Sequence, residues 1–248
     1  MDEPAEIIPR EPASSCEVVT TASLSGEQRT ALYRLMADHF ENVDAATFFR
    51  DLDEKQFVVL LHDSGTRRIV GFSTITSLET ELAGEPVGAV FAGDTIFAPE
   101  LWGQSSWLYR WGECGFQLAR QSRDPRAGLL LLTSTHRSYR FLPGFFHEFY
   151  PRFDRPTPPE VQARSAALVR LKFPQEYDPA TGVVAPQPET PVRPGREDPA
   201  ADALTDPHAQ YFLRANPGFA RGNYLACFAE LTWENLTPLG RRVVAGPR

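Results

Sequence analysis

A short turn between an expected strand and an expected helix carries the residues best suited to binding an anion. Residues 87–99 form an apolar run, and residues 102–106, Trp-Gly-Gln-Ser-Ser, follow as a turn before an amphipathic segment. The first backbone N–H groups of a helix lack partners within it, and the helix dipole adds partial positive charge there. The turn therefore predicts a phosphate site. The alternative is a plain strand-to-helix connection in which Ser105 or Ser106 caps the helix.

Asp94 is the one acidic residue within this apolar run. A lone carboxylate in a strand costs free energy unless it is paired or has a function. We therefore expect Asp94 to deprotonate or position a reacting group. The alternative is a structural aspartate that hydrogen-bonds Thr95 or nearby backbone.

Composition indicates a globular protein and excludes several classes of partner. The chain has 248 residues, of which 42% are hydrophobic, and a formal charge of −7 with scattered Lys and Arg, so neither nucleic acid nor an anionic membrane is expected to bind. The three cysteines form no C-x-x-C pair, and we expect neither disulfides nor a metal site. An acidic N-terminus without a secretory pattern, and no apolar run of membrane-spanning length, predict a cytoplasmic protein.

The first half of the chain predicts two helices followed by three strands. Residues 1–15 are expected to be a flexible lead-in, and 16–248 a single domain. A capping box at Ser25-Gly26-Glu27-Gln28 predicts a helix over 25–40. The remaining predictions are a short helix at 45–51, a hairpin of strands at 56–61 and 68–76, and a third strand at 87–98.

The second half predicts a crossover unit and a long irregular region. A helix over 105–121 is followed by a buried strand at 128–135 and an aromatic helical segment at 139–152 that Pro143 interrupts. Proline is then frequent, which predicts an excursion over 154–207. Residues 166–171 could form a strand or a short helix, and 224–231 is expected to return to the sheet.

These motifs, in this order, resemble the acyl-CoA-binding core of the GCN5-related N-acyltransferase (GNAT) superfamily. In that family the turn reads roughly Arg/Gln-x-x-Gly-x-Gly/Ala and holds the pyrophosphate of coenzyme A; here Gly103 and Gln104 match, whereas Trp102, Ser105 and Trp107 depart from the pattern. The resemblance implies an α/β fold with a mixed, mostly antiparallel sheet flanked by helices. In this chain a proline-rich insertion would follow near the C-terminus.

The resemblance also assigns roles to named residues. A β-bulge of the fourth strand, placed here at Thr95, Ile96 and Phe97, would offer backbone N–H groups to the acyl carbonyl, and the turn would hold the cofactor through Trp102, Gly103, Gln104, Ser105, Ser106 and Trp107. Tyr139 or Tyr150 would protonate the leaving thiolate, and His136 is a second candidate base. The alternatives are core tyrosines with their hydroxyls at the rim, and a histidine that caps a helix or lies in a loop.

The expected activity is transfer of an acyl group from acetyl-CoA or a longer acyl-CoA to a small-molecule or peptide amine. Aromatic residues in 102–111 and 139–153 could be core, or could line a wide apolar pocket. A wide pocket leaves open long-chain acylation of an amino acid or peptide, with an acyl carrier protein as donor. A catalytically silent ligand-binding protein also remains open. The chain is expected to be a monomer or a homodimer.

Overall fold

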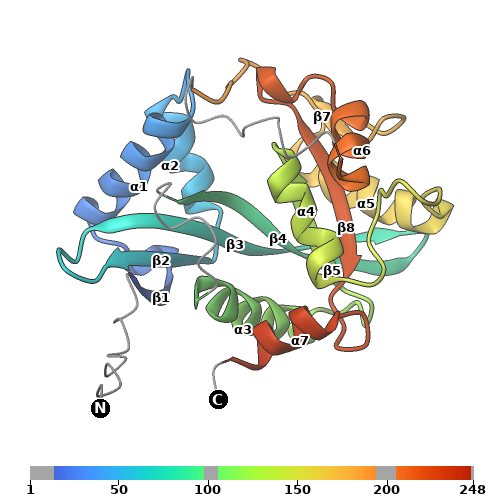
Figure 1. The fold of residues 1–248 in the computed structure, drawn as a ribbon, viewed down its shortest axis with the longest axis horizontal. Helices are drawn as coiled ribbons and strands as arrows, with labels where there is room; N and C mark the ends of the chain where they lie inside the picture. Colours follow the sequence, from blue (N-terminus) through green and yellow to red (C-terminus); the bar gives the residue numbers. More distant parts are fainter. Residues whose placement is uncertain (1–13, 98–105, 194–204, 247–248) are drawn as a thin grey trace, which may run out of the picture.

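The computed structural model describes residues 14–97, 106–193 and 205–246, and its strands form one mixed sheet (Figure 1). Within this part of the chain the sheet has eight strands in the order β1-β2-β3-β4-β5-β8-β7-β6. All neighbours pair antiparallel except β4 and β5, which are parallel. The strands are β1 (Ser14–Thr20), β2 (Phe57–Asp63), β3 (Ile69–Leu82), β4 (Glu85–Phe97), β5 (Gly128–Thr133), β6 (Tyr177–Asp178), β7 (Val183–Val184) and β8 (Tyr224–Glu230).

Helices cover both faces of this sheet, and alternate strand residues separate the two layers. The described helices are α1 (Gly26–His39), α2 (Ala45–Asp53), α3 (Ser106–Gln121), α4 (His136–Phe145), α5 (Pro159–Lys172), α6 (Pro207–Ala215) and α7 (Pro238–Ala245). Core residues of α3, α4 and α6 pack against one set of strand residues, which includes Val59 and Val90. Neighbouring residues Val58 and Phe91 belong to the cores beneath α1–α2 and α5. The period of two along each strand thus divides the core.

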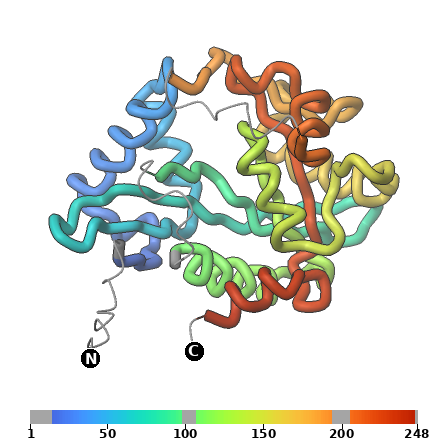
Figure 2. The backbone as a smooth tube through the Cα atoms, in the orientation of Figure 1, coloured from blue at the N-terminus to red at the C-terminus, as the bar shows by residue number. Residues whose placement is uncertain are grey.

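Local signals fix several element boundaries as expected. The Ser25 hydroxyl accepts from the backbone N–H of Gln28 at 3.1 Å, and the Gln28 side chain accepts from the backbone N–H of Ser25 at 2.8 Å. This capping box starts α1 where the sequence predicts. The turn between β3 and β4 has positive φ at Ala83 and Gly84, which suits a tight two-residue hairpin. In the backbone tube, the turn that projects at the left end of the sheet is the one between β2 and β3 (Figure 2).

Two expected boundaries need correction. Residues Ser14 and Ser15 were expected in a flexible lead-in, yet they begin β1, which pairs with β2. The aromatic segment 139–152 is helical only in its first part, because Phe146 bridges to Leu236 and Tyr150 to Phe228. A helix beyond α4 would break these backbone pairs.

The region 154–207 is less irregular than its prolines suggest. Residues 159–172 form α5, and the short strands β6 and β7 extend the sheet beyond β8. Pro158 and Pro159 stand at the start of α5, where proline is tolerated because the first N–H groups have no helical partner. The described part of this region therefore belongs to the layered fold, and a proline-rich insertion is not confirmed.

Asp124 ties the parallel pair to the helix layer. It lies in the turn between α3 and β5 and is 3% exposed. Its carboxylate accepts from the backbone N–H groups of Gly88 and Arg126 at 2.9 Å each, and from the Arg164 guanidinium at 2.5 Å. One buried side chain thus joins β4, the start of β5 and α5.

Candidate functional site

The sheet opens between β4 and β5. The two strands pair only from Ala89 with Gly128 to Ala92 with Leu131. Beyond this point β4 stays paired with β3, whereas β5 stays paired with β8. The end of β4 and the end of β5 therefore leave a wedge between them.

A β-bulge lies in β4 at the start of this wedge. Ser73 pairs with Thr95 and Ile75 with Ala92, so Thr74 alone faces both Gly93 and Asp94. A Cβ on Gly93 would lie 2.3 Å from the Thr74 hydroxyl oxygen and 2.8 Å from Cε of Lys55, so only glycine fits. The bulge thus lies at Gly93 and Asp94, just before Thr95, Ile96 and Phe97, the residues at which it was expected.

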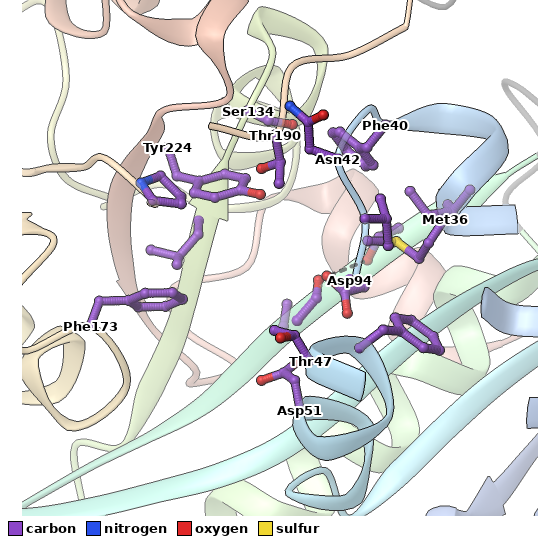
Figure 3. A pocket seen from close by; sticks show the side chains of 18 of the residues that line it. Met36, Phe40, Asn42, Thr47, Asp51, Asp94, Ser134, Phe173, Thr190 and Tyr224 are labelled. Atoms are coloured by element: carbon purple, nitrogen blue, oxygen red, sulfur yellow. Dashed lines mark hydrogen bonds between the residues drawn. The ribbon is translucent and has the colours of Figure 1, made fainter. Parts of the chain in front are cut away.

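A cavity of about 380 Å³ fills the wedge (Figure 3). Its wall comes from the α1–α2 connection, α2, the bulge of β4, the end of β5, and a segment at 186–190. The lining includes Ala92 and Leu131 from the core beneath α3 and Phe91 from the core beneath α5. Since both cores contribute, the cavity reaches through the sheet between its two helical layers.

Most of the surface of this lining is apolar, although polar and apolar side chains contribute to it in equal number. The apolar members are Met36, Phe40, Val43, Phe48, Phe91, Ala92, Ile96, Leu131, Leu132, Phe173, Pro186 and Pro188. The polar and charged members are Asn42, Asp44, Thr47, Asp51, Lys55, Asp94, Thr95, Ser134, Ser138, Gln187, Thr190 and Tyr224. An apolar pocket with a few convergent polar groups is the usual form of a small-molecule site.

Asp51 on α2 forms ion pairs with two lysines beside the cavity. Its carboxylate forms ion pairs with Lys55 and, at 3.2 Å, with Lys172, which also pairs with Glu54. The Lys55 side chain is 1% exposed and also lies over the ring of Phe91, 5.8 Å from its centroid. Burial opposes ionisation of Asp51, but the two lysines hold its pKa below its usual value.

Asp94 lies beside these charges without a direct partner. Its side chain makes no hydrogen bond or ion pair with any residue that the structure describes. Burial raises the pKa of Asp94 to about 6, while Lys55 and Lys172 oppose the rise and Asp51 adds to it. A carboxylate of this kind is mostly ionised at neutral pH and can accept a proton.

Tyr224 faces the cavity from the first residue of β8 (Figure 3). Its hydroxyl is hydrogen-bonded to the Thr190 side chain. Burial, with a smaller contribution from the Asp94 charge, raises the pKa of Tyr224 to about 12. The phenol therefore remains protonated at neutral pH and can donate a proton.

The other expected proton donors and acceptors lie away from the cavity. Tyr139 is fully buried in the core beneath α4, and its hydroxyl donates to the Pro151 carbonyl at 2.8 Å. Burial raises the pKa of Tyr139 well above its usual value. The Tyr150 hydroxyl donates to Glu148 at 3.1 Å, and His136 is buried at the start of α4. None of the three lines the cavity.

The expected cofactor turn is only partly visible. Trp102, Gly103, Gln104 and Ser105 lie outside the described residues, and α3 begins at Ser106. Trp107 packs on Phe97, with ring centroids 4.5 Å apart. Thr95 and Ile96 line the cavity, whereas Phe97 does not.

The segment 186–190 was not expected to contribute to a site. It lies against the α1–α2 connection, where the Asn42 side chain donates to the Glu189 carbonyl at 3.0 Å and Phe40 bridges to Val192. Its prolines predicted irregular backbone, and no local signal linked them to residues some 150 positions earlier. Lys55 and Tyr224 were missed for the same reason.

The order of the elements settles the fold. Two helices, three antiparallel strands with a bulge in the last, a crossover helix, a parallel strand and a further helix follow one another as the resemblance implies. This chain has the GNAT fold. Neither a protein-family model nor a curated protein matches the sequence.

The solved structures that resemble this protein match only part of its chain. A probable N-acyltransferase from Enterococcus faecalis V583 is 17% identical over 54% of this chain and 33% of its own, with a TM-score of 0.41. A GNAT family N-acetyltransferase from Escherichia coli in complex with CoA is 16% identical over 54% of this chain and 71% of its own, at 0.38. N-myristoyltransferase from Saccharomyces cerevisiae with bound myristoyl-CoA is 10% identical over 52% of this chain and 31% of its own, at 0.38.

These values leave activity and substrate open. The chain spans about a third of the length of the first and third of these proteins. Among the described residues of this GNAT fold, no cluster of His, Cys, Asp and Glu could hold a metal ion. No described helix combines the length and apolarity needed to span a bilayer.

Proposed function

We propose that this chain transfers an acyl group from a CoA-type thioester to an amine held in the cavity. The observation that carries the proposal is Asp94, an unpaired carboxylate in the wedge between β4 and β5, with a pKa of about 6. The amine nitrogen attacks the thioester carbonyl carbon and gives a proton to Asp94, and the C–S bond then breaks. Deprotonation matters because only a neutral amine has the free electron pair needed for attack.

The cavity's position supports two routes of entry. Helix α3, which follows in sequence the turn expected to bind pyrophosphate, covers one face of the sheet, whereas Phe91 and Lys55 lie on the face covered by α2 and α5. A thioester arriving past α3 and an amine arriving from the other face would meet in the wedge. Alignment of two reactants in this way can contribute much of a rate enhancement.

The bulge and Tyr224 supply the remaining chemistry. Backbone N–H groups at the bulge of Gly93 and Asp94, where the β3–β4 register shifts, can stabilise the negative oxygen formed on the acyl carbonyl. Tyr224, protonated at neutral pH, can donate to the leaving thiolate. We assign this role to Tyr224 rather than to Tyr139 or Tyr150, because Tyr224 alone of the three lines the cavity.

Acyl transfer is tested directly by the release of free thiol from acyl donors. Acetyl-CoA, longer acyl-CoA and acyl carrier protein thioesters would each be incubated with a panel of amines, and the acylated amine identified by mass spectrometry. Melting temperatures with CoA alone report donor binding separately, since a ligand that binds only the folded state stabilises it. Donor binding without any acylated product would overturn the enzymatic proposal and favour a silent binding protein.

Tyr224→Phe is expected to lower kcat about 10-fold to 100-fold, because it removes one general acid while water can still protonate the thiolate. The ring remains, so the melting temperature should change little. Tyr150→Phe is the matched control, since the Tyr150 hydroxyl lies outside the cavity and donates to the exposed Glu148. Equal kcat values for Tyr224→Phe and the unmodified protein would remove Tyr224 from the mechanism.

Lys55→Met is expected to move the rising limb of the pH–rate profile to higher pH. Lys55 is the largest influence that lowers the pKa of Asp94, and its loss also leaves more of the Asp51 charge unbalanced. Asp94 must lose its proton to act as a base, so a higher pKa delays activity to higher pH. Lys172→Met should move the limb in the same direction by less. A shift to lower pH would contradict the assigned role of Lys55.

A further inference from the structure

The cavity's charges have an uneven balance. Among its described lining residues, three carboxylates, Asp44, Asp51 and Asp94, stand against a single cation, Lys55. Lys55 is already paired with Asp51, whose other carboxylate oxygen is paired with Lys172. No described arginine lines the cavity. A ligand therefore meets the half-buried carboxylate of Asp94, which has no ion-pair partner among the described residues, and no unpaired cation.

This charge balance favours amines without a carboxylate over amines that carry one. An ammonium group entering the cavity gains the attraction of Asp94. A carboxylate carried on the same molecule would lose its hydration and find no cation in exchange, which is costly in an apolar site. Lys55 already donates to the carbonyl and to the carboxylate of Asp51, so most of its charge is offset before a carboxylate on the ligand arrives.

The rest of the wall selects an apolar body. Phe40, Phe48, Phe91 and Phe173 contribute rings, and Leu131 and Leu132 contribute aliphatic surface. A volume of about 380 Å³ lies at the lower end of the usual range for small-molecule sites, and it accommodates one ring with a short side chain. A small polar amine would leave most of this apolar surface unfilled.

We infer that the acceptor is a primary amine joined to an aromatic or branched aliphatic body that carries no carboxylate. This inference rests on the proposed function, because it takes the amine to be the molecule held next to Asp94. It excludes free amino acids as preferred acceptors. The selectivity arises from the absence of a free cation in the described wall rather than from a clash of shape.

Direct binding by calorimetry tests this selectivity without requiring turnover. The probes are 2-phenylethylamine, phenylalanine amide, phenylalanine and ethanolamine, each titrated into the full chain. Phenylalanine amide and phenylalanine have nearly the same shape and differ in charge. We expect 2-phenylethylamine and the amide to bind at least 10-fold more tightly than phenylalanine, and ethanolamine to bind at least 10-fold more weakly than 2-phenylethylamine.

A variant that adds a cation to the cavity wall should improve the binding of an amine that carries a carboxylate. Thr47 is an exposed lining residue of α2 with no role in the proposed chemistry, so Thr47→Lys places an ammonium at the wall, and Thr47→Gln is its neutral control (Figure 3). Thr47→Lys should reduce the ratio of the Kd of phenylalanine to the Kd of its amide at least threefold, whereas Thr47→Gln should leave this ratio unchanged. If Thr47→Lys leaves the ratio of the two Kd values unchanged, the absence of a free cation is not the reason for the selectivity.

The outcomes separate this inference from the proposed function. Phenylalanine binding as tightly as its amide, ethanolamine binding as tightly as 2-phenylethylamine, or no binding of any probe would each overturn the inference. If the probes bind in the expected order but none is acylated with any donor, the proposed function fails and the recognition of apolar amines stands. If amino acids are acylated as rapidly as apolar amines, the activity stands and the selectivity fails.

Discussion

Asp94→Asn is expected to lower kcat/KM for acyl transfer by about 10²–10⁴-fold, the usual contribution of a positioned general base. Asparagine has nearly the same shape but cannot take up the proton of the attacking amine. In the unmodified protein, activity should rise with pH through the pKa of Asp94, about 6, and then level off. The variant should lack this limb, which steady-state rates measured across that pH range would show.

Although Asp94→Asn should lower activity, it should not lower the stability of the fold at neutral pH. The folded-state pKa of Asp94 is raised from 3.8 to about 6, so the folded protein holds this proton more tightly than the unfolded chain. Its contribution to the free energy of unfolding is therefore greatest below pH 3.8 and is lost as pH rises through about 6. At neutral pH Asp94→Asn removes a buried charge, and its melting temperature should equal or exceed that of the unmodified protein.

Asp44→Asn is the matched control for Asp94→Asn. Asp44 also lines the cavity, but it is exposed and caps α2 by accepting from the backbone N–H of Thr47 at 2.8 Å. Asparagine caps a helix about as well, so α2 should remain intact. Comparable loss of activity in both variants, or full activity in Asp94→Asn, would show that Asp94 is not the base.

Asp124→Ala is expected to cost about 3–5 kcal/mol of folding free energy, the range found when one partner of a buried ion pair is removed. It leaves the Arg164 guanidinium, 11% exposed, without its carboxylate and also frees the backbone N–H of Gly88. Because the same side chain holds the start of β5 beside β4, the wedge should also lose order. Urea unfolding followed by circular dichroism measures the loss.

Asp53→Ala provides the comparison on the surface. Asp53 pairs with Arg29 at 2.6 Å, but its side chain is 62% exposed, and such pairs contribute about 0–1 kcal/mol. Both variants remove a carboxylate from an arginine pair, but Asp124 is buried and also accepts from two backbone N–H groups. Similar unfolding midpoints for Asp124→Ala and Asp53→Ala would mean that the Asp124 network does not hold the parallel pair in place.

The sequence was most informative where the deciding interactions are local. The capping box at Ser25 and Gln28 acts within three residues, and it placed the start of α1. The apolar run of β5 and the turn residues between β2 and β3 likewise act within a few positions. Asp94 stood out for a local reason too, because a carboxylate interrupts an apolar strand there.

Local sequence patterns gave wrong predictions where a segment forms backbone hydrogen bonds with a distant part of the chain. The aromatic spacing over 139–152 suits a helix, but the backbone of Tyr150 exchanges hydrogen bonds with Phe228 at 2.8 and 2.7 Å. Those bonds depend on β8 lying alongside, which no pattern within the segment reveals. The strand at the start of the described chain was missed in the same way, since its pairing partner is β2.

By itself the sequence predicted the order of the helices and strands from α1 to α4, and it singled out Asp94 as a carboxylate in an unusual, apolar setting. Only the tertiary structure decided the surroundings of Asp94. The splay of β4 from β5, the Lys172 ion pair with Asp51 across 121 positions, and the placing of Tyr224 and residues 186–190 all arise from contacts between distant segments. Caps and turns are set by neighbours along the chain, whereas the charge balance of a cavity depends on which remote side chains packing brings together.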